Sequence, residues 1–271
     1  MTLPEIAIPY ITLPPTADEL PSDDGIPMET GQHRIQMNLL IETLEQHWAD
    51  RDDFFAGGNM FIYFSPQQVR DYDYRGPDVF VALDVPRHPV RKSWVVWQEG
   101  KGPDVIIELI SESTAAFDKR EKKRIYQNRL RVPEYFWYDP LNGDWAGFAL
   151  REGRYVPIEP DAHGRLLSQQ LQLTLVRWQG VHNFIEATWL RWATLDGTLL
   201  PTSPERAEQE RIRAEQERIR AEQERIRAEQ ERIRAEQERV RADAVTQHAA
   251  TLEAALARYR EQFGELPGLD A

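Results

Sequence analysis

A seven-residue repeat, AEQERIR, runs through residues 205–242 and constrains the fold more than any other feature of the chain. It returns one large apolar residue every seven positions, at Ile212, Ile219, Ile226, Ile233 and Val240. This spacing predicts a continuous helix, but so narrow an apolar face cannot build a compact core. A globular domain is therefore expected only within roughly the first 200 residues.

The expected organisation has three parts. Residues 1–27 are rich in proline and acidic residues, which favours an extended arm over the surface. Residues 28–200 are predicted to form one folded domain, because a chain of 271 residues with 41% hydrophobic content can bury a core of ordinary size. Residues 201–271 predict a charged heptad-repeat helix that is followed by an amphipathic C-terminal helix.

The helical tail offers two faces to a partner. With isoleucine at heptad position d, position a is always glutamine, so only half of the seam is apolar and association through it should be weak. Beyond the repeat, a more apolar stripe follows in a shifted phase: Val245, Ala249, Leu252, Leu256, Tyr259 and Phe263. Such a stripe favours a role in oligomerisation, with a homodimer as the preferred form, or as a spacer; an unassociated helix is the alternative.

Composition excludes several classes of protein. The chain has no cysteine, so disulfide scaffolds, thiolate zinc sites and cysteine nucleophiles are excluded. Its net charge of −12 argues against tight binding of nucleic acid through bulk electrostatics. The run KREKKR at 119–124 is locally basic, and it is either a nucleic-acid contact or a solvated helix face.

The N-terminal stretch gives no sign of export. It lacks a basic start followed by a long apolar core, and no run of about 18 uncharged apolar residues occurs anywhere in the chain. A cytoplasmic protein without membrane spans is therefore expected.

Hydrophobic periodicity predicts a mixed α/β domain. A helix is expected over 28–49 and another over 111–130, ending before Pro133. Five main strands are expected at 58–64, 78–84, 93–99, 104–110 and 134–139, and short antiparallel ones at 145–150, 154–158 and 171–176. The strand, helix and strand over 104–139 form a β-α-β unit, so its two strands should be parallel.

One charged residue, Glu108, interrupts the apolar strand DVIIELI. Burying a lone carboxylate costs several kcal/mol, so a cation is expected beside it, as a metal ion, a lysine or both. Asp78 opens a neighbouring strand, and Lys122 lies in phase with the apolar side of the following helix. Two carboxylates with a nearby lysine can hold Mg²⁺, whose coordinated water is a natural nucleophile for a phosphodiester.

Structural alternatives exist for each of these residues. Asp78 could be a turn residue, and Glu108 could pair with an arginine for stability alone. Asp104 faces the same side as Glu108 but lies about 13 Å away along the strand, which favours a structural role. His33 is better explained as a satisfied helix histidine, and Asp118 as an ion-pair partner of Lys122.

The phrases GPDVFVALD and GPDVIIELISESTAAFDKREKKRIYQNRLRVPEYFWYDP resemble a specific family. Over about residues 25–190 the chain is similar to the Uma-two type of putative restriction endonucleases, in the PD-(D/E)XK nuclease superfamily. The resemblance implies a restriction-endonuclease-like mixed sheet flanked by helices. It also implies DNA hydrolysis that depends on Mg²⁺ or Mn²⁺, with Asp78 and Glu108 as metal ligands.

The sequence departs from the superfamily pattern at one position. The superfamily motif carries lysine two residues after its glutamate, where this chain has Ile110. In similar families this lysine is thought to lie on the next helix, which here offers Lys119, Lys122 and Lys123. Lys122 matches the spacing best, Lys123 is second, and Glu29 is a further candidate carboxylate. The alternative is a catalytically silent fold that acts as a binding or assembly module through its C-terminal helix.

Overall fold

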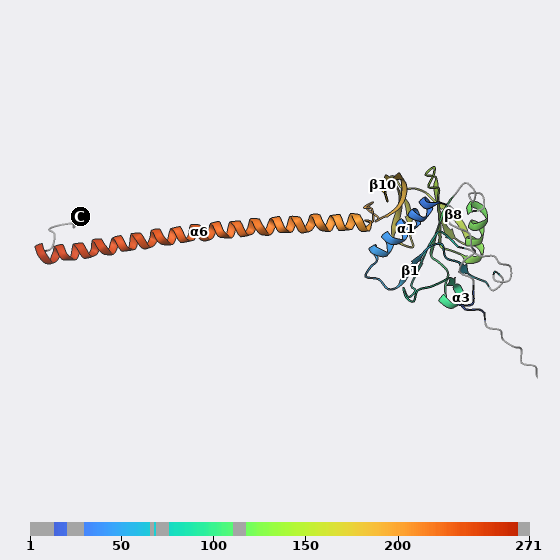
Figure 1. Ribbon diagram of the computed structural model, residues 1–271, viewed down its shortest axis with the longest axis horizontal. Helices are drawn as coiled ribbons and strands as arrows, with labels where there is room; N and C mark the ends of the chain where they lie inside the picture. The colour runs from blue at the N-terminus through green and yellow to red at the C-terminus, as the bar shows by residue number, and fades with distance from the viewer. Residues whose placement is uncertain (1–13, 21–29, 66–67, 69–75, 111–117, 265–271) are drawn as a thin grey trace, which may run out of the picture. The chain divides into compact units, whose positions relative to one another are not determined.

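The protein is described from a computed structural model, which covers residues 14–20, 30–65, 68, 76–110 and 118–264. The chain divides into two compact units, residues 1–203 and residues 204–271. The first contains all of the described strands, and the described part of the second is almost entirely one long helix (Figure 1).

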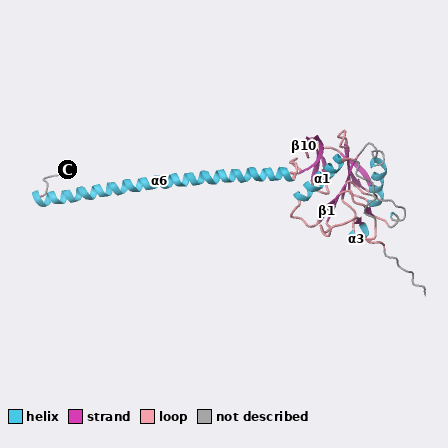
Figure 2. Ribbon diagram, in the orientation of Figure 1, coloured by secondary structure: helices cyan, strands magenta, loops and turns pink. Residues whose placement is uncertain are grey.

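A six-stranded mixed sheet forms the centre of the first unit (Figure 2). Only one neighbouring pair is parallel, β5 with β6, and this pair flanks the predicted β-α-β crossover. All other pairs in the sheet are antiparallel. In spatial order the strands are β1 (Phe54–Gly57), β3 (Val79–Leu83), β5 (Val105–Leu109), β6 (Glu134–Tyr138), β7 (Trp145–Arg151) and β8 (Arg154–Ile158).

Helix α1 (Gly31–His47) covers one face of this sheet (Figure 1). Thr30 caps its first turn by accepting a hydrogen bond from the backbone N–H of His33 at 3.2 Å. Leu40 and Leu44 are buried against Val79, Val81 and Ile107 of the sheet. The helix therefore shields the face of β3 and β5 that is opposite to Glu108.

A second, three-stranded antiparallel sheet packs against the other side of α1. It contains β9 (Leu166–Ser168), β10 (Leu173–His182) and β11 (Ile185–Ala193). The Gln36 side chain donates to the Leu190 carbonyl and accepts from the Leu190 N–H, both at 2.8 Å. This paired amide fixes the helix to β11 by satisfying both backbone groups of one buried residue.

A helix from residue 118 to 130 covers the opposite face of the large sheet. It contains two π-helical turns, η1 (Asp118–Lys122) and η2 (Tyr126–Leu130), on either side of the short α5 (Lys123–Ile125). Ile125 and Tyr126 are buried against Phe80, Ile106 and Tyr135. The predicted helix is present here, although residues 111–117 lie outside the described part of the chain.

Two predicted strands differ from the structure. The stretch 93–99 forms only β4 (Trp94–Val95) and then a short helix, α3 (Val96–Glu99), while 58–64 shortens to β2 (Ile62–Tyr63). The α3 turn ends at Gly100, which has a φ of 80° and donates to the Val96 carbonyl, so the chain reverses within an apolar stretch. Strands β1, β9 and β11 had not been predicted.

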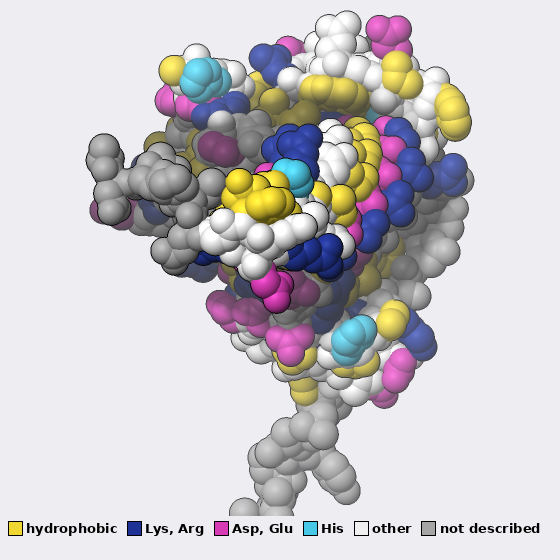
Figure 3. Space-filling model, turned by 90° about the vertical axis from the view of Figure 1, so that its left-hand side faces the viewer, with side chains coloured by type: hydrophobic (Ala, Val, Ile, Leu, Met, Phe, Trp, Pro, Cys, Tyr) yellow, Lys and Arg dark blue, Asp and Glu magenta, His cyan; other side chains and the backbone are white. Residues whose placement is uncertain are grey.

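Helix α6 (Ser203–Phe263) makes up most of the described part of the second unit, and none of its residues is buried. Its C-terminal end exposes Leu252, Leu256, Tyr259 and Phe263. Figure 3 shows hydrophobic side chains gathered on the face of the molecule that is turned toward the viewer. Among the described residues, no helix combines the length and the apolar character needed to cross a membrane. The predicted mixed α/β class with a long C-terminal helix is confirmed.

Gly58 sets the close approach between α1 and the start of β3. A Cβ atom at this position would lie 2.2 Å from the Asp78 carbonyl oxygen and 2.8 Å from Met37 Sδ. Gly58→Ala should therefore displace Asp78 and lower the free energy of unfolding by about 1–3 kcal/mol, as overpacking does. Gly31→Ala is the control, because a Cβ atom added at Gly31 would have no neighbouring atom within 4 Å.

Urea denaturation of both alanine variants tests this prediction. Gly31→Ala should be neutral or stabilising by up to about 1 kcal/mol, since alanine favours helix over glycine. Equal stability of the two variants would contradict the assigned contact at Gly58.

Candidate active site

Glu108 lies in the middle of the large sheet and has no exposed surface. The Tyr126 hydroxyl donates to its Oε1 at 2.6 Å, and the Lys122 ammonium donates to its Oε2 at 2.9 Å. Both donors come from the helix that crosses over β5 and β6. The cation required by a buried carboxylate is thus, within this chain, a lysine.

Asp78 directly precedes β3, the strand that pairs with β5. The last pair of this antiparallel register is Val79 opposite Ile107, so Asp78 and Glu108 are the next residues along the two chains. The Asp78 Oδ2 atom also accepts a hydrogen bond from the Leu109 N–H at 2.7 Å, which ties the aspartate to the residue after Glu108.

The three candidate lysines have different neighbours. The Lys119 ammonium lies 4.1 Å from the ring centroid of Trp137, and that of Lys123 lies 3.2 Å from the ring centroid of Phe148. Lys122 alone among them has an ion pair with Glu108 in the described residues. Since all three lysines are half-buried, the basic run is not simply a solvated helix face.

Lys123 is partly desolvated. Partial burial against Phe148 lowers the pKa of Lys123 below its usual value, because the charged form loses contact with water. Lys122 ends the π-helical turn η1, and Lys123 begins α5.

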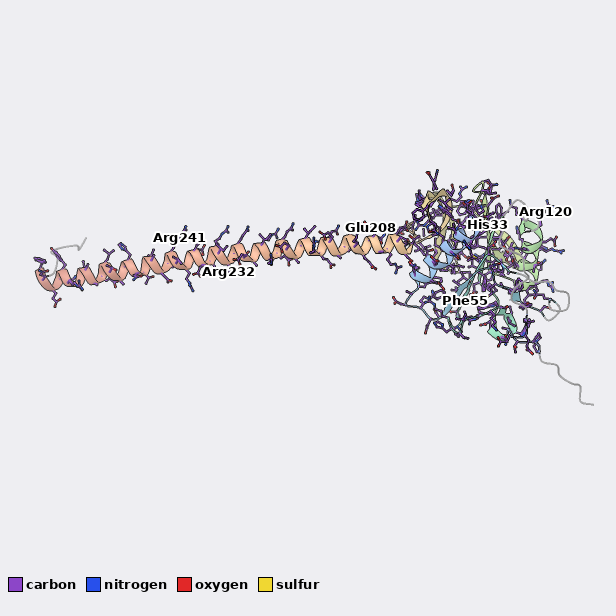
Figure 4. The ribbon with its side chains drawn as sticks, in the orientation of Figure 1. His33, Phe55, Arg120, Glu208, Arg232 and Arg241 are labelled. Carbon is purple, nitrogen blue, oxygen red and sulfur yellow. The ribbon has the colours of Figure 1, made fainter. Side chains whose placement is uncertain are left out.

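The remaining predicted residues lie elsewhere or outside the described chain. Asp104 accepts from the Lys101 ammonium and from the Leu83 N–H, both at 2.7 Å, near the opposite end of β5. His33 is buried on α1, where its Nδ1 is 2.9 Å from the Thr30 hydroxyl (Figure 4). Glu29 falls outside the described residues.

Tyr126 is a site residue whose role was not predicted from the sequence. It is fully buried, and its hydroxyl lies closer to the Glu108 carboxylate than the Lys122 ammonium does. The sequence feature that indicates this role is its position four residues after Lys122, which places both side chains on one side of a helix.

A second buried carboxylate, Glu134 on β6, has a different environment. It accepts hydrogen bonds from the Ser168 hydroxyl at 2.5 Å and from the Gln169 N–H at 2.7 Å. Burial raises the pKa of Glu134, although these hydrogen bonds oppose the shift. Because its partners are a hydroxyl and backbone amides, Glu134 holds β6 to the segment that follows β9.

The residues at this end of the sheet fit a magnesium-type site. Mg²⁺ commonly takes one or two protein carboxylates and keeps several waters, so Asp78 and Glu108 form a sufficient donor pair. Within the described ranges, no group of three or more histidine, aspartate or glutamate side chains could hold a metal. A site that needs four protein ligands is therefore not found there.

Comparison with known proteins assigns the chain to a family. Residues 19–179 match the family Uma2, described as "Putative restriction endonuclease". The chain belongs to this family. The resemblance inferred from the sequence motifs is thus confirmed, and the family match includes the positions of Asp78, Glu108 and Lys122.

A search of solved structures found a crystal structure of a putative nuclease from Anabaena variabilis. It shares 17% sequence identity with this chain, with a TM-score of 0.41. The alignment covers 58% of this chain and 91% of the other. A search of curated proteins found no match.

Removing the Lys122 charge should destabilise the protein, because Glu108 would stay buried without its cation. Lys122→Met is expected to lower the free energy of unfolding by about 3 kcal/mol. Lys123→Met is the matched control and should change it by no more than about 0.5 kcal/mol, since burial already disfavours the charged form of Lys123.

Both variants are compared by urea denaturation in the presence of EDTA, so that no divalent cation can replace the lysine. If Lys122→Met were as stable as Lys123→Met, the ion pair would not be what makes the burial of Glu108 tolerable.

Proposed function

We propose that this protein is a divalent-metal-dependent endonuclease that hydrolyses phosphodiester bonds in DNA. Asp78 and Glu108 are the proposed metal ligands, and Lys122 is the proposed catalytic lysine. DNA is the substrate class that best agrees with a family described as restriction endonucleases.

The observation that carries this proposal is the fully buried Glu108 with its Lys122 partner. A buried ion pair adds little net stability compared with an apolar pair of similar volume, so stability alone is a weak reason to keep one. Asp78 supports the proposal as a second carboxylate, because it accepts a hydrogen bond from the N–H of Leu109, the residue after Glu108.

The metal ion, when bound, supplies a Lewis acid that offsets negative charge on the scissile phosphate. Glu108 and Asp78 hold their carboxylates at one end of β5 through the contacts to Tyr126 and to the Leu109 N–H. The Lys122 ammonium can orient the attacking water and stabilise the charge that builds on phosphorus. Tyr126 is a positioning residue, because it acts on Glu108 and not on the substrate.

Attraction of DNA to an acidic chain requires basic groups near the site. The exposed side of the 118–130 helix carries Arg120, Arg124 and Arg129, while its lysines turn toward the sheet. Figure 4 shows Arg120 on this helix. These arginines are the groups that we expect to contact phosphates on either side of the cleavage position.

Metal binding tests the two carboxylates without any activity measurement. Titration calorimetry with Mg²⁺ or Mn²⁺ should give a binding heat for the wild type, and Glu108→Gln should bind at least about tenfold more weakly. Glu134→Gln is the control, because it neutralises a buried carboxylate on the adjacent strand whose partners are a hydroxyl and backbone amides.

Similar metal affinity in the wild type, Glu108→Gln and Glu134→Gln would remove Glu108 from the site. A loss of affinity in both glutamine variants would point to a general effect on the fold and not to ligation.

Cleavage of supercoiled and linear DNA tests the reaction itself. Asp78→Asn keeps an oxygen that can accept from the Leu109 N–H, and both this variant and Glu108→Gln should cut at least about 100-fold more slowly. Lys122→Met should also reduce the rate by about 100-fold or more, whereas Lys123→Met should retain the wild-type rate within a few-fold.

Absence of cleavage by the wild type with every divalent metal would refute the proposed activity and favour the assembly module. Full activity of Lys122→Met would refute only the lysine assignment.

A further inference from the structure

Helix α6 presents a repeated surface that stays unburied along its whole length. The large apolar side chains of the repeat are 44–57% exposed, and they recur with the seven-residue spacing of a coiled coil. Each repeat also carries two glutamates and two arginines, so its net charge is zero. A second copy of this helix can therefore approach without net electrostatic repulsion.

Only some of the charged side chains of the repeat form ion pairs within the helix. The glutamate just before each seam glutamine pairs with the arginine three residues later, at 2.8–3.0 Å. These five pairs join heptad position g to position c, on the flank of the helix. Within the described helix, the arginines at position e form no ion pair: Arg213, Arg220, Arg227, Arg234 and Arg241.

The residues that flank the seam carry one sign on each side. Position g is glutamate in all five repeats and position e is arginine in all five. In a parallel pair, g of one helix faces e of the next heptad on its partner, so Glu215 meets Arg220 and every such contact is attractive. In an antiparallel pair, g faces g and e faces e, so glutamates meet glutamates and arginines meet arginines.

From this charge pattern we infer that α6 pairs in parallel and in register with α6 of a second copy of the chain. Isoleucines at d form the apolar layers, and glutamines at a meet their equivalents, where they can hydrogen-bond across the seam. A polar residue at a is the type of group that specifies register in coiled coils. The partner is a second copy of this chain, because each helix carries both the glutamates at g and the arginines at e that such a pairing needs.

The apolar stripe at the end of α6 does not select an orientation in this way. Its members Leu252, Leu256 and Tyr259 are exposed, but they lie in a different phase from the isoleucines. The positions that flank them carry no regular alternation of charge. This stripe can add apolar contact area to an assembly whose direction is set by the repeat.

The absence of cysteine makes single-cysteine crosslinking a clean test in the full chain. Gln209→Cys and Gln237→Cys place one thiol near each end of the seam, about 42 Å apart along a helix. A parallel, in-register pair brings each new thiol next to its own copy, so each variant alone should form a disulfide-linked dimer in a glutathione redox buffer. Glu210→Cys, at the outward position b, is the control and should crosslink at least about tenfold less.

An antiparallel pair gives the opposite result, because position a then faces position d at the other end of the partner helix. Neither seam variant would crosslink alone, and a disulfide would form only in mixtures such as Gln209→Cys with Val240→Cys. That result, or crosslinking of the outward control to the same extent, would overturn the proposal.

Charge-reversal variants test the proposed contacts between glutamates at g and arginines at e. The triple change Arg220→Glu, Arg227→Glu and Arg234→Glu puts glutamate on both sides of the seam, and light scattering should then show a monomer. The matched control is Arg218→Glu, Arg225→Glu and Arg232→Glu, which changes the net charge equally but at position c. This control should keep twice the chain mass of 31.6 kDa.

The proposal fails if the wild type has the mass of one chain at every concentration, or if both triple variants dissociate alike. Circular dichroism of each variant shows whether the helix itself is retained. None of these measurements involves DNA cleavage, so their outcome does not depend on the proposed function.

Discussion

The burial of Glu108 is the constraint on which the rest of the first unit depends. A carboxylate with no exposed surface requires donors on both oxygens, and the chain provides them from a single helix, through Tyr126 and Lys122. This requirement fixes the height and rotation of the helix over β5. The crossover from β5 to β6 and the parallel pairing of these strands then follow from the direction in which the helix must return.

The contrast with Glu134 shows that burial alone does not separate a proposed metal ligand from a carboxylate with a structural role. Both glutamates are on central strands of the same sheet and both are almost completely buried. Glu134 is satisfied by the Ser168 hydroxyl and by backbone N–H groups, which hold two segments together. Glu108 instead has an ammonium partner, and Asp78 accepts a hydrogen bond from the residue that follows it, so the proposed metal ligands lie next to a lysine.

The partner of a buried charge could be predicted from the sequence, because the residues next to it in the chain determine its surroundings. Glu108 within an apolar strand demanded a partner, and the phase of the next helix pointed to Lys122, which is the lysine beside it. The 93–99 stretch was misassigned because valine and tryptophan favour strands locally, whereas Gly100 imposes a turn on the residues before it. Tyr126 gained its role only from the structure, because a buried tyrosine on an apolar face looks like core in a sequence.

The charged side chains of the two units lie in opposite environments: one key carboxylate of the first unit is buried, whereas the charges of α6 are exposed. The repeat balances two glutamates against two arginines in every seven residues, so the chain's net charge of −12 resides entirely outside it. In the first unit, the charge of Glu108 is removed from water, so the loss of its charged partner would cost several kcal/mol of folding free energy. In α6 the charges are solvated and individually weak, so they contribute little to stability. Their effect comes from repetition: a consistent sign on each side of the seam favours one orientation of a partner helix at every heptad, even though no single pair would decide it.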